Sequence, residues 1–206
     1  MELRTDFDWK NAAPSCAHPY LWPALKSEIA KRSWDDKRAF DLGCGNGVTA
    51  NMLSELGFDV TGVDPSESGI KQAQCAYPHI KSELGDAYEP LSERFGTFPL
   101  LVSLEVVEHV YAPRAFAKTA FDLLYSGGVA LMSTPYHAYL KNLAIAMSGS
   151  FDRHVNPLSD GGHIKFWSPR TLKALLEETG FSAVDFIRVG RIPSLAKSMI
   201  AVCYKP

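Results

Sequence analysis

The sequence predicts an α/β fold: a doubly wound, seven-stranded and mostly parallel sheet whose last strand is antiparallel. Short apolar runs alternate with segments of helical periodicity along most of the 206 residues. The run at 98–104 is almost entirely apolar, which is typical of a strand covered on both faces. The last two apolar runs are joined by a short turn at 190–194, which predicts an antiparallel hairpin at the sheet edge.

Each element follows from a local signal. Strands are expected at 38–42, 58–63, 80–84, 98–104, 129–133, 181–189 and 196–204. Helices are expected at 21–31, 48–56, 66–76, 113–125, 140–147 and 168–179. Ser66 and Ser168 are suitable N-caps, Gly180 suits the end of the last helix, and the glycine pair 127–128 predicts a stop for the helix at 113–125.

The chain is expected to form a single domain over residues 1–206. Two segments fall outside the alternation of strands and helices. The front segment, 1–36, contains the first helix and is expected to act as a helical lid. The insertion at 135–167 follows the fifth strand, and insertions of this length in compact domains are usually functional. We expect it to cap a substrate site.

Composition narrows the classes of partner. Lys and Arg total 21 against 23 Asp and Glu, a net charge of −2, so no overall basic field favours nucleic-acid binding. No apolar run approaches the roughly 20 residues that span a bilayer, and the charged N-terminus does not resemble a signal peptide. The four cysteines form no C-x-x-C pair. These features predict a cytoplasmic protein with a small-molecule partner, and they leave its oligomeric state open.

The most informative stretch is Asp-Leu-Gly-Cys-Gly-Asn-Gly at 41–47, between a strand and a helix. Glycines there let the backbone turn tightly and let a ligand approach closely. Asp64 ends the next strand, where an acid accepts hydrogen bonds from ribose hydroxyls. An acid at Asp41 would repel a pyrophosphate but suits a cation such as an α-ammonium group. Ribose, adenine and an amino-acid cation together indicate S-adenosylmethionine.

Five motifs in this order resemble the class I S-adenosylmethionine-dependent methyltransferases. They lie at 41–47, Asp64, 85–87, 104–110 and 123–128, where Ser126 replaces the usual proline. The segment at 104–110, Leu-Glu-Val-Val-Glu-His-Val, is similar to that of the ubiquinone-biosynthesis O-methyltransferases. The resemblance covers about 35–135 and 163–206, and it implies the Rossmann-like fold of this family.

The resemblance also implies a set of cofactor contacts. Asp41 and the glycine backbone would hold the amino-acid end of S-adenosylmethionine, Asp64 the ribose, and Asp86 with Ala87 the adenine. The full predicted set is Asp41, Gly43, Cys44, Gly45, Asn46, Gly47, Asp64, Pro65, Asp86, Ala87, Leu104 and Glu105.

Glu105, Glu108 and His109 fall where the fourth strand ends, at the edge of the sheet that binds ligands in open α/β folds. Three roles are compatible with them: a site for a divalent cation such as Mg²⁺, an acid–base site, or a hydrogen-bonded loop. The resemblance to the ubiquinone-biosynthesis O-methyltransferases implies the first role, a site for a divalent cation. Histidine is a less typical ligand for Mg²⁺, whereas an imidazole, with its ordinary pKa of about 6.5, suits a general base. Glu108 and His109 are therefore the catalytic candidates.

The predicted insertion supplies aromatic and imidazole side chains for the acceptor. The substrate candidates are Tyr136, His137, Tyr139, His154 and His163, which suit a planar or anionic molecule. The expected function is methylation of a small-molecule acceptor, most directly on oxygen. Two alternatives stay open: a non-catalytic S-adenosylmethionine-binding protein, and a methyltransferase that acts on a nucleic acid or a protein. The absence of an N-P-P-Y motif after the fourth strand speaks against methylation of base or glutamine amino groups.

Overall fold

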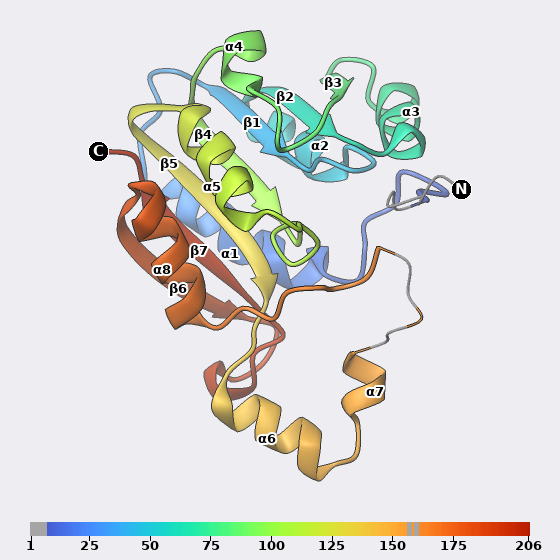
Figure 1. Ribbon diagram of the computed structural model, residues 1–206. Coiled ribbons are helices and arrows are strands. Elements are labelled where there is room, and N and C mark those ends of the chain that lie inside the picture. The colour runs from blue at the N-terminus through green and yellow to red at the C-terminus, as the bar shows by residue number, and fades with distance from the viewer. Residues whose placement is uncertain (1–7, 156–157, 159–160) are drawn as a thin grey trace.

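A computed structural model describes residues 8–155, 158 and 161–206 (Figure 1). Within these residues seven strands form one sheet in the order β3-β2-β1-β4-β5-β7-β6. The strands are β1 Arg38–Leu42, β2 Asp59–Asp64, β3 Lys81–Leu84, β4 Phe98–Leu104, β5 Leu124–Pro135, β6 Ser182–Val189 and β7 Ser198–Tyr204. The first five are parallel, and β7 runs antiparallel to both β5 and β6, which confirms the predicted fold class.

Helices precede and connect these strands. They are α1 His18–Ala30, α2 Val48–Glu55, α3 Glu67–Ala76, α4 Leu91–Phe95, α5 Pro113–Asp122, α6 Tyr139–Met147, α7 Phe151–His154 and α8 Pro169–Thr179, with a 3₁₀ turn, η1, at Pro193–Leu195. The side chain of Ser66 caps α3, and Ser168 forms a capping box at the start of α8. Both predicted caps are confirmed.

The sheet separates two apolar cores. On one face Phe116 of α5 and Leu172 of α8 pack with Leu101 of β4, and on the other Leu21 of α1 packs with Leu100. Figure 1 shows α5 and α8 together on one side and α1 behind the sheet. Because successive side chains of a strand point to opposite faces, β4 contributes to both cores, as its apolar sequence predicted.

The prediction for the helix at 113–125 was wrong at its end. The helix ends at Asp122, and β5 begins at Leu124, so the glycine pair lies inside a strand. Gly127 has φ +87°, and the pairing with β4 shifts between Phe98 and Leu100. The buried Leu124 holds the early part of β5 in the sheet, and the glycines accommodate a bulge.

The two segments outside the alternation occupy different places. Residues 8–17 run beside α2 and α3, ahead of α1. Helices α6 and α7 lie beyond the carboxyl end of β5, below the body of the sheet in Figure 1. The expected helix at 140–147 corresponds to α6, while α4 and α7 had no clear signal in the sequence.

Candidate functional site

The glycine loop makes a tight turn from β1 into α2. Gly43, Gly45 and Gly47 all have positive φ, which glycine adopts without strain. The N–H groups of Gly43 and Cys44 both donate to the carbonyl of Val63, at 2.8 and 3.1 Å. A Cβ on Gly43 would lie 2.5 Å from Cγ2 of Val106, so the loop contacts the segment that follows β4.

Asp64 holds this loop from the end of β2. Its Oδ2 accepts the N–H of Gly45 at 2.8 Å, and its Oδ1 accepts the N–H of Ser66 at 2.9 Å. The half-buried carboxylate thus joins the glycine loop to the start of α3, while the next residue, Pro65, is exposed. Each carboxylate oxygen can accept a second hydrogen bond, so the group remains able to bind hydroxyls.

Asp41 is 1% exposed, and its Oδ2 has no hydrogen-bond partner among the described residues. Burial, with the charge of Asp64 second, raises the pKa of Asp41 to about 8. A cation beside the loop would stabilise the ionised form of this carboxyl group and lower its pKa. The buried, unpartnered oxygen therefore fits a ligand with an ammonium group, such as the amino-acid end of S-adenosylmethionine.

The remaining predicted cofactor residues surround this point. Asp86 and Ala87 are half-buried after β3, and Oδ1 of Asp86 accepts the N–H of Tyr88 at 2.9 Å, which shapes the turn. Leu104 is half-buried at the end of β4. The thiol of Cys44 is buried, and burial raises its pKa well above the ordinary value, so it stays protonated in this loop.

Part of the front segment, ahead of α1, covers the glycine loop. The indole of Trp9 packs against Gly45 and Gly69, where any Cβ would collide with it. The amide of Asn46 donates to the carbonyls of Asn11 and Ala13, at 2.9 and 3.0 Å. The front segment is thus bound to the predicted cofactor loop ahead of α1. Trp9 is the one aromatic residue in the stretch 8–17, which shows no periodicity that would have predicted this contact.

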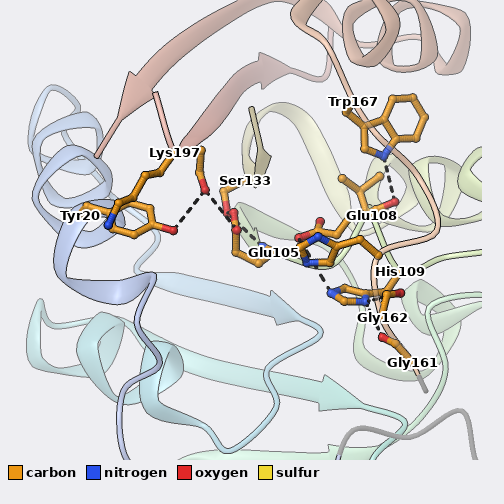
Figure 2. A network of polar contacts seen from close by, with 12 residues as sticks. Tyr20, Glu105, Glu108, His109, Ser133, Gly161, Gly162, Trp167 and Lys197 are labelled. Atoms are coloured by element: carbon orange, nitrogen blue, oxygen red, sulfur yellow. Dashed lines mark hydrogen bonds and ion pairs between the residues drawn. The ribbon is translucent and has the colours of Figure 1, made fainter. Parts of the chain in front are cut away.

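Glu105 adopts a left-handed backbone conformation, with φ +56°, directly after β4. Its N–H donates to the carbonyl oxygen and to Oγ of Ser133, and its carboxylate accepts Oγ–H of Ser133 at 2.7 Å. The hydroxyl of Ser198 donates to the second oxygen at 3.2 Å and lies 3.4 Å from the hydroxyl of Tyr20 (Figure 2). Burial raises the pKa of Glu105. These contacts tie α1, β5 and β7 to the end of β4.

Glu108 is 1% exposed, and neither of its carboxylate oxygens has a hydrogen-bond partner among the described residues. Nε2 of His109 and Nε2 of His163 each lie 4.0 Å from Oε1 of Glu108. Burial, followed by the charge of Glu105, raises the pKa of Glu108 well above its ordinary value. The three side chains form a cluster that we call the Glu–His–His cluster.

Hydrogen bonds fix the orientation of His109 in this cluster. Its Nδ1 lies 2.8 Å from the carbonyl oxygen of Gly161 and 3.2 Å from that of Gly162 (Figure 2). Since a carbonyl oxygen only accepts, Nδ1 carries a proton, and in the neutral ring the lone pair is then on Nε2, the nitrogen nearer Glu108. Burial, then His109 and His137, lowers the pKa of His163 to about 4, so His163 is a neutral imidazole.

The cluster differs from the cation site predicted at Glu105, Glu108 and His109. Ligating atoms of Glu108, His109 and His163 lie within 4.8 Å of one another, whereas the Glu105 carboxylate is bound to two serines. Magnesium prefers six oxygen ligands, and one carboxylate with two imidazoles suits borderline ions instead. These residues do not fit Mg²⁺.

The predicted substrate residues of the insertion fall in different places: two line a cavity and one joins the Glu–His–His cluster. A cavity of about 180 Å³ is lined mainly by apolar groups, among them Ile145 and Phe166, together with His137 and His154. Tyr136 is buried at the end of β5, and Tyr139 is 78% exposed and lies outside the cavity lining. His163 instead joins Glu108 and His109.

The segment at 161–167 connects the insertion to the end of β4. The N–H groups of Ile164 and Lys165 both donate to the carbonyl of Glu108, at 2.9 and 3.0 Å. The indole N–H of Trp167 donates to the carbonyl of Val107 at 3.1 Å (Figure 2). The same segment therefore supplies His163 to the cluster and Phe166 to the cavity wall.

The fold and the glycine loop define a nucleoside-binding α/β domain, and comparison with known proteins gives its class. A family model described as a methyltransferase domain matches residues 17–185. The chain belongs to this methyltransferase domain family.

Curated relatives carry a more particular name. A ubiquinone biosynthesis O-methyltransferase from Caulobacter sp. (strain K31) is 38% identical over 145 residues, which are 68% of this chain and 57% of the relative. The mitochondrial protein of that name from Homo sapiens is 32% identical over 155 residues, 70% of this chain and 41% of the relative. The aligned part of the chain spans about six-tenths or less of the length of these relatives.

Solved structures share the fold at low identity. Magnesium protoporphyrin IX methyltransferase from Synechocystis PCC 6803, with bound SAH, has a TM-score of 0.69 at 16% identity. The match covers 89% of this chain and 81% of that enzyme's chain. A SAM-dependent methyltransferase from Archaeoglobus fulgidus has a TM-score of 0.65 at 17% identity, and the match covers 90% of this chain and 93% of that one.

No helix among the described residues is long and apolar enough to cross a membrane.

Proposed function

We propose that this chain transfers a methyl group from S-adenosylmethionine to a hydroxyl oxygen of a small-molecule acceptor. The observation that carries the proposal is the position of the Glu–His–His cluster. Its Glu108 and His109 lie in the segment that follows β4, and Val106 in the same segment contacts Gly43 of the glycine loop. The backbone N–H of His109 donates to the carbonyl of Val106 at 2.9 Å, so the segment that carries this imidazole also reaches the loop that would hold the methyl donor. The name of the curated relatives supports oxygen as the acceptor atom.

Three regions of the chain would hold the cofactor. Asp41 would face the ammonium group beside the loop, Asp64 would offer acceptors to the ribose, and Asp86 with Ala87 would border the adenine. S-adenosylmethionine supplies a methyl group that its sulfonium already activates. The protein's contribution is then to position the acceptor, exclude water and remove a proton.

His109 removes that proton in this proposal. Its Nε2 lone pair is free because Nδ1–H donates to Gly161 and Gly162. The imidazolium that forms lies 4.0 Å from Glu108, and a neighbouring cation favours the ionised form of that buried carboxyl group. Positioned general bases contribute about 10²–10⁴-fold to reaction rates.

Calorimetry and kinetics test the proposal together. Calorimetry should show binding of S-adenosylmethionine and S-adenosylhomocysteine, and catechol should be methylated at a measurable rate. His109→Gln should lower kcat about 10²-fold and leave the Kd for S-adenosylhomocysteine unchanged. His79→Gln is the matched control, since His79 is exposed before β3. Failure to bind either nucleoside overturns the function, and an unchanged kcat in His109→Gln overturns the role of the base.

A metal test addresses the second role of the cluster. Because the donor set does not suit Mg²⁺, dialysis against EDTA followed by assay in Mg²⁺-free buffer should leave the rate unchanged. A rate that falls after EDTA and returns with Mg²⁺ would contradict this expectation. Recovery with Zn²⁺ or Mn²⁺ alone would instead assign the two imidazoles and Glu108 to a borderline ion.

A further inference from the structure

The turn that carries His109 away from β4 is held from outside by the segment at 161–167. Within the turn, the N–H of His109 donates to the carbonyl of Val106 at 2.9 Å. Val107 lies between these two residues, and its carbonyl accepts the indole N–H of Trp167 at 3.1 Å (Figure 2). Trp167 is 60 positions further along the chain. The turn and the segment are therefore joined by tertiary packing.

The imidazole of His109 makes the return contact, at the opposite end of the same segment. Its Nδ1–H donates to the carbonyl oxygens of Gly161 and Gly162, at 2.8 and 3.2 Å. A neutral imidazole carries its proton on one nitrogen, and the hydrogen bond of that nitrogen decides which one it is. The tautomer of His109, and with it the lone pair on Nε2, therefore depends on where these two carbonyls lie.

Trp167 is the apolar anchor of the segment at 161–167. Its half-buried ring packs against the core on the α5 and α8 face of the sheet, and its carbonyl accepts the N–H of His137 at 3.0 Å. The other large apolar side chains of the segment are more exposed, Ile164 by 38% and Phe166 by 45%. One residue thus binds the segment to the core, to the residues after β5 and to the turn after β4.

We infer that Trp167 is a positioning residue that fixes the tautomer and orientation of His109. Its indole N–H holds the carbonyl of Val107, and this contact keeps the carbonyls of Gly161 and Gly162 beside the imidazole. A reacting group that is displaced by about 1 Å can react about 10²-fold more slowly, so a residue that holds the base indirectly still affects the rate. The inference rests on the proposed function and adds a residue that acts on the reaction through His109.

The first test reads the tautomer directly. ¹⁵N NMR of the histidine rings at pH 8, above the ordinary imidazole pKa of about 6.5, should show the Nδ1–H form of His109, whose signals are identified by their loss in His109→Gln. Trp167→Phe keeps an aromatic ring and removes the N–H, and the Nε2–H form should then appear. Trp34→Phe is the matched control, because the indole N–H of Trp34 also donates to a backbone carbonyl, that of Ile29, at 3.0 Å on the other face of the sheet.

Kinetics with S-adenosylmethionine and catechol supply the second test. Trp167→Phe should lower kcat about tenfold with little change in KM, and Trp34→Phe should change neither. In the His109→Gln background, Trp167→Phe should cause no further loss, because the effects of residues that act through one group do not add. Trp167→Met, which also lacks the N–H and packs adaptably, is measured in parallel, and thermal unfolding identifies any variant that does not fold.

An unchanged tautomer and an unchanged kcat in Trp167→Phe would overturn the positioning role and leave the methyltransferase standing. An equal further loss in the His109→Gln background would overturn it as well, since the effect would then not pass through His109. If the wild type binds neither S-adenosylmethionine nor S-adenosylhomocysteine, the proposed function fails. The NMR comparison of wild type, Trp167→Phe and Trp34→Phe then still decides whether Trp167 positions the imidazole.

Discussion

The two halves of the site satisfy their acidic groups in different ways. On the cofactor side, Asp64 accepts backbone N–H groups from Gly45 and Ser66, which lie in neighbouring turns. On the acceptor side, Glu108 is buried beside His163, which comes from a distant segment, and neither of its carboxylate oxygens has a hydrogen-bond partner within residues 8–155, 158 and 161–206. The first half is built by local turn geometry, and the second is assembled from remote parts of the chain.

This difference indicates how each half is suited to bind its ligand. Local hydrogen bonds fix the glycine loop, so its shape suits a ligand of constant structure. An unpartnered buried carboxyl group raises the free energy of the folded state. Such a group is retained where a ligand or a proton completes it. Asp41 in the cofactor half and Glu108 in the acceptor half are both groups of this kind among the described residues, so the halves differ in how they are built, the first by local turns and the second by distant segments. The following changes test this division.

The largest effect on cofactor affinity should come from Asp64→Ala, which removes the carboxylate that holds the loop and that would bind the ribose in our proposal. We expect cofactor affinity to fall by about 1.5–3 kcal/mol, the loss of a charge-assisted hydrogen-bonded contact. Calorimetry with S-adenosylhomocysteine measures this. Asp59→Ala, at the exposed start of the same strand, is the control. Equal affinity in wild type and Asp64→Ala would show that the ribose is held elsewhere.

A separate prediction concerns the pH dependence of the free energy of unfolding, to which Asp41 contributes. Its pKa in the folded protein, about 8, exceeds the ordinary 3.8, so the folded state binds more protons than the unfolded state between these values. The stabilising contribution is therefore fully present below about pH 4 and is lost as pH rises through 8. The free energy of unfolding should fall with pH by up to about 1.4 kcal/mol per unit from this group.

Urea denaturation from pH 5 to pH 8.5 measures that slope, and Asp41→Asn should flatten it. Saturating S-adenosylmethionine should also flatten it in the wild type, since a bound cation would favour the ionised carboxylate. Parallel curves for wild type and Asp41→Asn would refute the assignment to Asp41.

The smallest effect should come from Ser133→Ala on the acceptor side. The substitution removes the hydroxyl that donates to Glu105 at 2.7 Å, and we expect a loss of about 1 kcal/mol in unfolding free energy. Cofactor affinity should not change, an outcome that would place Glu105 outside the cofactor contacts that the sequence predicts. Ser182→Ala, exposed on β6, is the control for removal of a serine hydroxyl. A drop in cofactor affinity would break the proposed separation of the halves.

The sequence predicted the sheet, and it placed the glycine loop next to Asp64, because both features depend on short stretches of the chain. Alternating apolar runs defined the strands, and Asp41, the glycines and Asp64 occupy adjacent turns. The Glu–His–His cluster was predicted in part: Glu108 and His109 are adjacent, but His109 bonds to Gly161, 52 positions away. Trp9 over the glycine loop and the bulge at Gly127 were missed for the same reason. A contact made only by tertiary packing leaves no periodic pattern.

The place of β7 has a consequence for synthesis of the chain. β7 lies between β5 and β6, although it follows both in sequence. Until it leaves the ribosome, β5 presents an unpaired edge, and Glu105 lacks the hydroxyl of Ser198. The strands of the cofactor half precede it, and domains fold as their segments emerge. A nascent chain can therefore complete its nucleoside-binding half first, and the acceptor half closes with the final strand.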